Sequence, residues 1–203
     1  MARVLTHMCM SLDGFVAQPD DNPAELFDWY WSGDVVVPSA QETMSFSVDA
    51  ASAPMLQQLT SGCGALIAGR RLFDQTDGWG DNHPAGAPVV VVTHRPPPEN
   101  AATRFPRTAF TGSVDEGIAT AKEIAGDKFV TIASADIIQQ ALNLSLVDEL
   151  CISQCRCCSA PACATSASSS AATSCSRTPS WCKAPGRCTS AIPCDAERRD
   201  RRP

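Results

Sequence analysis

The residues of this chain best suited to chemistry are Gly69-Arg70-Arg71, which stand where a strand-like apolar run leads into a helix-like run. A glycine lets a ligand approach the backbone closely, a helix N-terminus favours anions, and an arginine supplies a guanidinium group. These residue types in this order are typical of a phosphate-binding site. The other interpretation is a pair of surface arginines near a turn.

The cysteines suggest metal binding by their number, but not by their spacing. Nine of the eleven lie at or after Cys151, and the remaining two, Cys9 and Cys63, are expected to be small apolar core residues. The C-terminal segment has one Cys-x-x-Cys, from Cys155 to Cys158, with no second pair at zinc-finger spacing and no histidine after His94. Zinc sites need four ligands on a defined frame, so we predict no metal site.

The elements that would position Gly69-Arg70-Arg71 alternate between strands and helices. The run Val89–Val92 has no polar alternation, which indicates a strand buried on both faces of a sheet. Alternation of this kind predicts an α/β domain with a mostly parallel sheet and ligands at the strand ends. The expected strands are 4–10, 65–68, 89–92, 109–110, 129–132 and 150–152, and the expected helices are 24–31, 49–59, 72–76, 114–125 and 135–144.

The helix expected over 114–125 has the clearest start signal. Ser113 is a good N-cap, and Glu116 follows it at the spacing of a capping box. Its inner face is expected to consist of Ile118, Ala121, Ile124 and Ala125.

Length and charge limit the classes of function. A chain of 203 residues suggests one domain, with or without a tail. The net charge of −6 and the isoelectric point near 5.0 argue against nucleic acid or an anionic membrane as the main partner. No apolar stretch approaches the roughly 20 residues that span a bilayer. The N-terminus runs directly into a strand pattern without a signal-peptide cleavage site, so we expect a cytoplasmic protein.

The character of the chain changes after Gln154. Residues 1–154 read as an α/β domain, whereas residues 155–203 are rich in Cys, Ser, Ala, Pro and Arg and contain no aliphatic run. A shift of one base explains the change. Read in the other frame with GC-rich codons, Cys155–Ala162 can give Val-Pro-Val-Leu-Leu-Gly-Ala-Gly, and Ser174–Asp195 can give two strand-like segments with a turn. We therefore hypothesise a frameshifted, disordered tail, which resequencing of the gene across the Gln154 codon tests.

Three segments together resemble one known family. They are Met10-Ser11-Leu12-Asp13-Gly14-Phe15-Val16-Ala17, the run from Gly64 to Asp74, and Ala135–Leu142 followed by Leu146-Val147-Asp148-Glu149-Leu150. In order and spacing they resemble the dihydrofolate-reductase-like superfamily. The closer likeness is to the reductase domain of the bifunctional riboflavin-biosynthesis deaminase–reductase.

The resemblance implies a three-layer fold, hydride transfer from NADPH, and a small heterocyclic or ribosylated substrate. The fold would have a mostly parallel central sheet whose last strands are missing or replaced by a non-native tail. The restored frame matches what this family has next. Family members often form homodimers, so a homodimer is a further expectation.

The resemblance also assigns cofactor-binding residues. Gly69, Arg70 and Arg71 would hold phosphate, and Thr93 with His94 would lie near the adenosine 2′-phosphate, unless they only cap a loop. The turn Ala133-Ser134-Ala135-Asp136 would face the pyrophosphate. Ala133 replaces the glycine usual in the family, so its Cβ is expected to crowd the cofactor or to disfavour an unusual backbone geometry. Ser134 is expected to cap the next helix and to donate to a phosphate.

On the substrate side, the resemblance places Asp13 and Gly14 beside the nicotinamide. Asp13 would orient substrate or relay a proton, or it only forms the turn before Gly14. Asp28 and Trp29 are candidates for substrate contact, although aromatic residues near a core more often pack there. The carboxylate that dihydrofolate reductases use has no counterpart here, so we do not predict folate reduction.

Two other interpretations stay open at this point. The chain could be an inactive or unstable frameshifted product of a reductase gene, because losing the last strands exposes apolar strand edges. It could instead be a binding or redox protein that uses the thiols or a metal in its Cys-rich tail.

Overall fold

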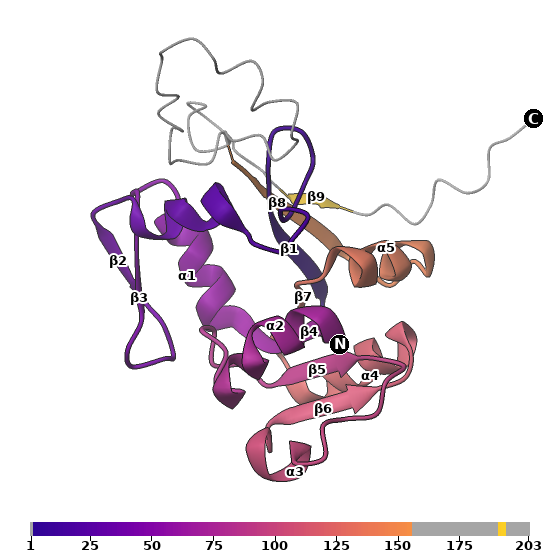
Figure 1. The fold of residues 1–203 in the computed structure, drawn as a ribbon. Helices are drawn as coiled ribbons and strands as arrows, with labels where there is room; N and C mark the ends of the chain where they lie inside the picture. Colours follow the sequence, from indigo (N-terminus) through magenta and orange to yellow (C-terminus); the bar gives the residue numbers. More distant parts are fainter. Residues whose placement is uncertain (1, 156–190, 194–203) are drawn as a thin grey trace, which may run out of the picture.

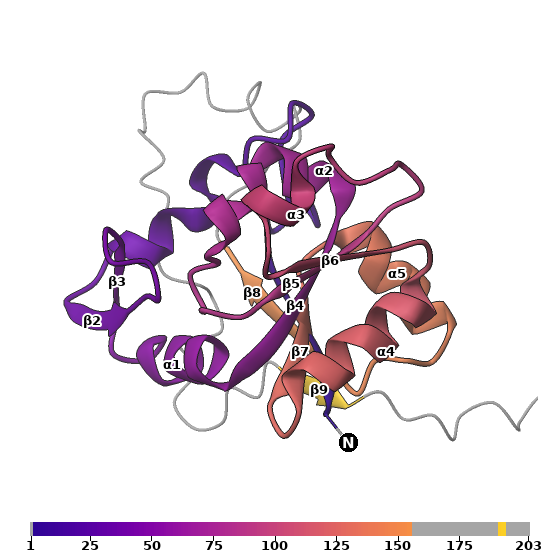
Figure 2. The same ribbon diagram turned by 90° about the horizontal axis from the view of Figure 1, so that it is seen from below.

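A seven-stranded sheet forms the centre of the molecule, with strand order β6-β5-β4-β7-β1-β8-β9 (Figures 1 and 2). The structure is a computed structural model that describes residues 2–155 and the backbone of 191–193. Neighbouring strands are parallel except for the pair β8 and β9. The strands of this sheet are β1 (Val4–Met10), β4 (Cys63–Gly69), β5 (Val89–Val92), β6 (Thr108–Thr111), β7 (Phe129–Ile132), β8 (Glu149–Gln154) and β9 (Ala191–Pro193).

Helices cover both faces of the sheet. Helices α4 (Val114–Ala125) and α5 (Ala135–Asn143) pack on one face, in the core around Ile118 and Ile138. The elements on the other face are η1 (Ala24–Trp31), the antiparallel hairpin of β2 (Val35–Pro38) and β3 (Ser45–Val48), α1 (Ala53–Gly62), α2 (Arg70–Gln75), η2 (Asp77–Asp81) and α3 (Ala101–Arg104). Figure 2 shows α4 and α5 on one side of the strands and α1 with the hairpin on the other. This confirms the predicted three-layer α/β fold.

Strand β5 has the position that its sequence predicts. All four valines of Val89–Val92 are buried, because the strand lies between β4 and β6 with a core on each face. The prediction of a strand buried on both faces is confirmed.

Helix α4 starts as predicted but buries a different set of residues. The Ser113 hydroxyl accepts from the Glu116 N–H at 3.4 Å, and the Glu116 carboxylate accepts from the Gly112 N–H at 3.1 Å. Ile124 is 40% exposed, so its predicted place on the inner face is wrong. The inner face instead includes Val114 and Gly117, at the helical spacing that leads to Ile118, Ala121 and Ala125.

Strand β9 falls within the predicted tail. Its residues Ala191–Pro193 pair with the start of β8, whereas residues 156–190 and 194–203 lie outside the described part of the chain. The frameshift hypothesis therefore stays a prediction. Among the described residues, none of the helices has the length and apolar character needed to cross a bilayer.

Candidate functional site

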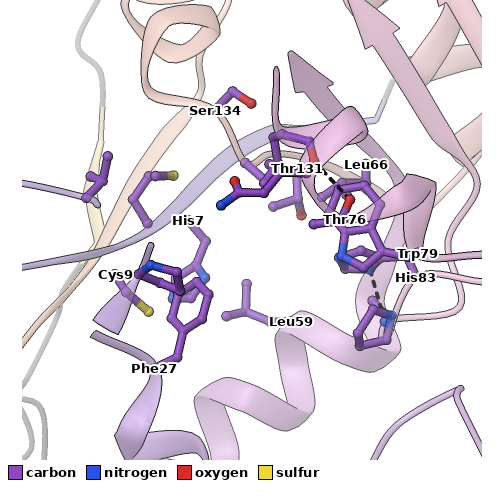
Figure 3. Close-up of a pocket in the computed structure, with 18 of the residues that line it drawn as sticks. His7, Cys9, Phe27, Leu59, Leu66, Thr76, Trp79, His83, Thr131 and Ser134 are labelled. Carbon is purple, nitrogen blue, oxygen red and sulfur yellow. Dashed lines mark hydrogen bonds between the residues drawn. The ribbon is translucent and has the colours of Figure 1, made fainter. Parts of the chain in front are cut away.

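A cavity of about 950 Å³ lies at the carboxyl ends of β4 and β7, between the sheet and the layer that contains η1 and α1 (Figure 3). Its wall includes Gly69, the last residue of β4, then Arg70 and Arg71, and also the segment 133–137, which follows β7. These strands are neighbours in the sheet, so both segments reach the same edge. The volume is in the range of small-molecule and cofactor sites.

A hydrogen bond joins the two segments. The Gly69 N–H donates to Ser134 Oγ at 2.8 Å. Gly69 has an extended backbone with φ −77°, which any residue can adopt. A Cβ added there would lie 3.5 Å from Ser134 Oγ and 3.7 Å from Ile137 Cγ1, both ordinary contacts. Neither the backbone nor the packing of the protein therefore requires glycine at this position.

The N-terminus of α5 opens into the cavity without a side-chain cap. Ser134 is the N-cap residue, but its hydroxyl bonds Gly69 across the sheet and accepts no N–H of its own helix. The prediction that Ser134 caps this helix is therefore wrong. The first intrahelical bond near this end runs from the Ile138 N–H to the Ser134 carbonyl. The N–H groups before it in the first turn have no partner within the helix, and this end of a helix favours an anion.

Ala133 fits its position without backbone strain. It is absent from the residues with positive φ, and its N–H donates to the Ile67 carbonyl at 3.0 Å. An unusual backbone geometry is thus not required there, which corrects one of the two predicted effects of replacing glycine. The other effect, crowding of a ligand by the Cβ, stays a prediction because Ala133 does line the cavity.

The arginines beside the cavity are already paired with carboxylates. Arg70 Nε lies 2.7 Å from Asp74 Oδ1, its Nη1 donates to the Pro96 carbonyl, and Arg95 Nη2 lies 2.8 Å from Asp74 Oδ2. Burial raises the pKa of Asp74, but hydrogen bonds and charge from Arg70 and Arg95 outweigh it, and the pKa is lowered overall. A guanidinium group from the start of α2 and one from the loop after β5 thus meet at one carboxylate.

Arg71 is paired on the other side of the same opening. Its Nε lies 2.5 Å from Asp21 Oδ2, and the Gln75 side chain donates to the Asp21 carbonyl oxygen. These bonds attach the loop that follows β1 to α2. Because the Arg71 side chain is 77% exposed, the ion pair contributes little to stability.

Two half-buried histidines, His7 and His83, line the cavity. Burial lowers the pKa of His7 and of His83 to about 4 each. His7 Nε2 lies 2.9 Å from Ser153 Oγ, and His83 Nδ1 accepts from the Ala85 N–H at 3.1 Å. Neither histidine was predicted as a site residue from the sequence. A polar His7 within the apolar run of β1 was the available signal.

Comparison with known proteins identifies the family. The family model of the RibD C-terminal domain matches residues 2–155. This chain belongs to the RibD C-terminal domain family. The resemblance drawn from the sequence is thereby confirmed, and the matched range ends where the character of the sequence changes.

A solved structure supports the fold of this RibD C-terminal domain. It is a crystal structure of a protein assigned to riboflavin biosynthesis from Shewanella sp. PV-4, with a TM-score of 0.53 and 20% sequence identity. The match covers 78% of each chain. At this identity the likeness concerns the fold. The comparison with curated proteins gave no significant match.

In this RibD C-terminal domain, Thr93 and His94 lie outside the cavity wall. Both are part of the loop after β5, where Thr93 Oγ1 accepts from the Arg95 N–H at 3.0 Å. The loop is connected to the cavity edge through Arg95 and Asp74. Thr93 thus caps the loop, and a role of Thr93 or His94 beside a cofactor phosphate stays a prediction.

Asp13 and Gly14 form an exposed turn after β1. Gly14 has φ +91°, a conformation that L side chains rarely adopt, and its N–H donates to the Ser11 carbonyl at 3.1 Å. Val16 and Ala17, just beyond the turn, line the cavity, whereas Asp13 and Gly14 do not. The predicted turn that ends at Gly14 is confirmed, whereas a role of Asp13 or Gly14 beside the substrate stays a prediction.

Neither of the predicted substrate contacts from η1 lies on the cavity wall. Trp29 is 2% exposed, its Nε1 donates to Cys9 Sγ at 3.3 Å, and its ring stacks on Tyr30. The predicted substrate contact of Trp29 is thus corrected to a core role. Asp28 is exposed on the outside of η1. The aromatic residues that do line the cavity are Phe27, Tyr30, Trp31, Phe46 and Trp79.

Proposed function

We propose that this RibD C-terminal domain is an NADPH-dependent reductase that transfers hydride to a C=N or C=O bond of a small ring compound. The observation that carries the proposal is the bond from Gly69 to Ser134. It holds the β4 and β7 loops together at one edge of the sheet, on the wall of one cavity. Loops beyond the carboxyl ends of parallel strands are the usual ligand positions in α/β folds.

The first turn of α5 would bind the pyrophosphate of NADPH. Its N–H groups have no side-chain cap, and the Ser134 hydroxyl still has its own proton to donate. The space where a Gly69 side chain would stand allows the phosphate to approach the backbone. Asp136, in the first turn of α5, opposes an anion, although its carboxylate is partly engaged by Gln140 Nε2 at 2.7 Å.

Arg70 and Arg95 would bind the 2′-phosphate that distinguishes NADPH from NADH. Their guanidinium groups are held side by side by Asp74, and each has donors beyond the ones that Asp74 uses. A phosphate that reaches both would gain charge-assisted hydrogen bonds. NADH has a hydroxyl at the same position and would gain much less.

When bound, NADPH supplies the hydride, and the cavity residues position and enclose the reacting groups. The apolar wall excludes water from the site of transfer. The acceptor atom needs a proton, for which Asp13 is the proposed source, after movement of its exposed turn. Phosphate, sugar and ring of the cofactor would run from the edge of the sheet into the cavity.

Cofactor titration tests the proposal. Binding of NADPH and NADH is measured by isothermal titration calorimetry with the unaltered chain, Arg70→Ala and Arg3→Ala. We expect NADPH to bind more tightly than NADH, and Arg70→Ala to weaken NADPH about 10- to 100-fold, as loss of a charge-assisted bond predicts. Arg3 forms an exposed ion pair with Glu149 at the start of β1, so its replacement should change nothing.

No binding of either cofactor would reject the reductase and favour the alternative of an inactive frameshifted product. Equal binding of NADPH and NADH would reject the role of Arg70 and Arg95. The Cys-rich tail, where a thiol- or metal-based function would reside, lies outside the described residues apart from Cys155 and the backbone of 191–193.

A further inference from the structure

The charges on the cavity wall are unevenly distributed. Among the described residues, its arginines and lysines are limited to Arg70 and Arg71, at the start of α2. Both are paired with carboxylates, and the proposed reductase assigns this end of the cavity to the cofactor phosphates. The other charged groups on the wall, Asp21 and Asp136, are acids.

The histidines do not add positive charge. Because burial lowers the pKa of His7 and His83 to about 4, both rings are neutral at pH 7. Away from Arg70 and Arg71, an anionic substrate group would therefore find no counter-charge among the described residues of the wall. Burying an unpaired charge is strongly unfavourable.

The wall on the far side from Ser134 is apolar and aromatic. Phe27 and Leu59 lie across the cavity from Ser134 (Figure 3). Tyr30 and Trp31 join Phe27 from η1, and Leu56 joins Leu59 from α1. Aromatic side chains in such a wall favour a flat ring, on which they stack or against which they pack edge to face.

At the end of β7, near Ser134, one buried hydroxyl lacks an ordinary hydrogen-bond partner among the described residues. Thr131 Oγ1 is buried and forms no hydrogen bond of ordinary geometry among the described residues, although the Cys63 thiol is near enough to interact weakly. Thr131 lines the cavity beside the end of β7 (Figure 3). Because Oγ1 has almost no exposed surface, a ligand would reach this hydroxyl only after the residues around it moved, so the substrate site does not depend on it.

We infer that the substrate is a flat, uncharged, conjugated carbonyl or imine compound without a phosphate group. This inference rests on the proposed reductase function and makes it narrower. NADPH would transfer hydride to the carbon of the C=O or C=N bond and leave as NADP⁺. The oxygen or nitrogen would take a proton from Asp13, the proposed donor, and water would then reprotonate Asp13. A ribosyl phosphate attached to the ring would place a dianion against the apolar wall.

A matched pair of probes tests the inference. Lumiflavin and FMN share one flat ring system, and FMN carries in addition a ribityl phosphate. With NADP⁺ held at saturation to block the phosphate-binding end, the affinity of each probe is measured by fluorescence quenching. We expect lumiflavin to bind at least about tenfold more tightly than FMN. The reason is that binding of FMN would bury its phosphate without a cation beside it.

Two variants and one control assign the preference to this wall. Phe27→Ala should weaken the binding of lumiflavin several-fold. Leu144→Ala, which removes an exposed side chain away from the cavity, should leave this binding unchanged. Leu59→Arg places a cation in the wall and should shift the preference toward FMN. Circular dichroism checks that each variant is folded.

Tighter or equal binding of FMN would overturn the inference, as would a failure of lumiflavin to bind. These outcomes are separate from failure of the reductase proposal, which is judged by NADPH binding alone. The probes are therefore also measured without NADP⁺. A chain that binds lumiflavin but not NADPH would keep the apolar ring site and reject the reductase.

Discussion

Gly69 is the residue at which cofactor binding and folding make different demands. Its extended backbone accepts any residue, and the protein leaves room for a Cβ. Glycine is needed there only if a ligand approaches the backbone. A substitution at this position can therefore separate binding from stability.

We predict that Gly69→Ala retains the melting temperature but weakens NADPH about tenfold or more. The added methyl group has ordinary contacts at 3.5 Å in the free protein, whereas pressing it against a bound phosphate costs about 1–3 kcal/mol. Differential scanning fluorimetry and calorimetric titration measure the two effects. Gly112→Ala is the control, because its Cβ would also have space and lies away from the cavity. Unchanged NADPH affinity in Gly69→Ala would mean that the bound cofactor does not approach the backbone of Gly69 closely.

Single residues also show what the sequence could not reveal. Trp29 belongs to an aromatic cluster that was correctly placed in a short helix, but only its packing on Tyr30 and its bond to Cys9 show that it faces the core. Asp74, in contrast, was not predicted as a site residue. Its importance comes from Arg95, which is 21 residues away in the chain and meets it only in the folded state.

The helices α4 and α5 differ in how a serine is used at the start. Ser113 caps its own helix, as the sequence predicts. Ser134 precedes its helix in the same way, yet its hydroxyl bonds Gly69 of the neighbouring β4. Local sequence predicts a capping residue in both cases, and only the parallel arrangement of β4 and β7 decides between them.

Alanine at these two serines should therefore have different effects. Ser113→Ala should lower the free energy of unfolding by about 0.5–1 kcal/mol and leave NADPH affinity unchanged. Ser134→Ala should cost about 1 kcal/mol, because the Gly69 N–H loses its acceptor, and should also weaken NADPH several-fold. Urea unfolding and calorimetric titration measure both quantities. A loss of NADPH affinity in Ser113→Ala, or none in Ser134→Ala, would contradict the placement of the cofactor.

Most strands of the sheet could be predicted because each is a short buried run between turn residues. The bounds of β5, β7 and α4 agree with the prediction. The hairpin of β2 and β3 was missed, since Val35–Pro38 contains a proline and Ser45–Val48 is short and half polar. These strands are defined by pairing with each other and by packing in the core around Leu26 and Val48.

At the scale of the whole molecule, the sheet brings together segments that are far apart in sequence. Strand β7 lies between β1 and β4, so the end of β4 at Gly69 and the turn after β7 at Ser134 become neighbours. The cavity combines a charged end at the sheet edge with an apolar end beneath η1 and α1. From sequence, the charged end could be proposed through the family resemblance, whereas the apolar end depends on side chains from several elements that only the fold assembles.

Six of the seven described strands of the sheet lie before the point where the sequence changes. Strand β8 pairs with β1 along its whole length, and Cys155 is still part of the core beside Leu26. The matched family range also ends at residue 155. The proposed site is built by residues before this point, so we expect cofactor binding to depend on them directly.

The most direct test of the proposed site is an NMR titration of the ¹⁵N-labelled chain with NADPH. The largest amide shifts should occur at Gly69 and Arg70 and in the first turn of α5, over residues 135–137, with smaller shifts in the loop of Arg95. NADH should shift the α5 amides but affect Arg70 and Arg95 less. Saturable binding whose shifts are concentrated elsewhere, or no shifts at Gly69 and the α5 N-terminus, would contradict the nucleotide site at this edge of the sheet.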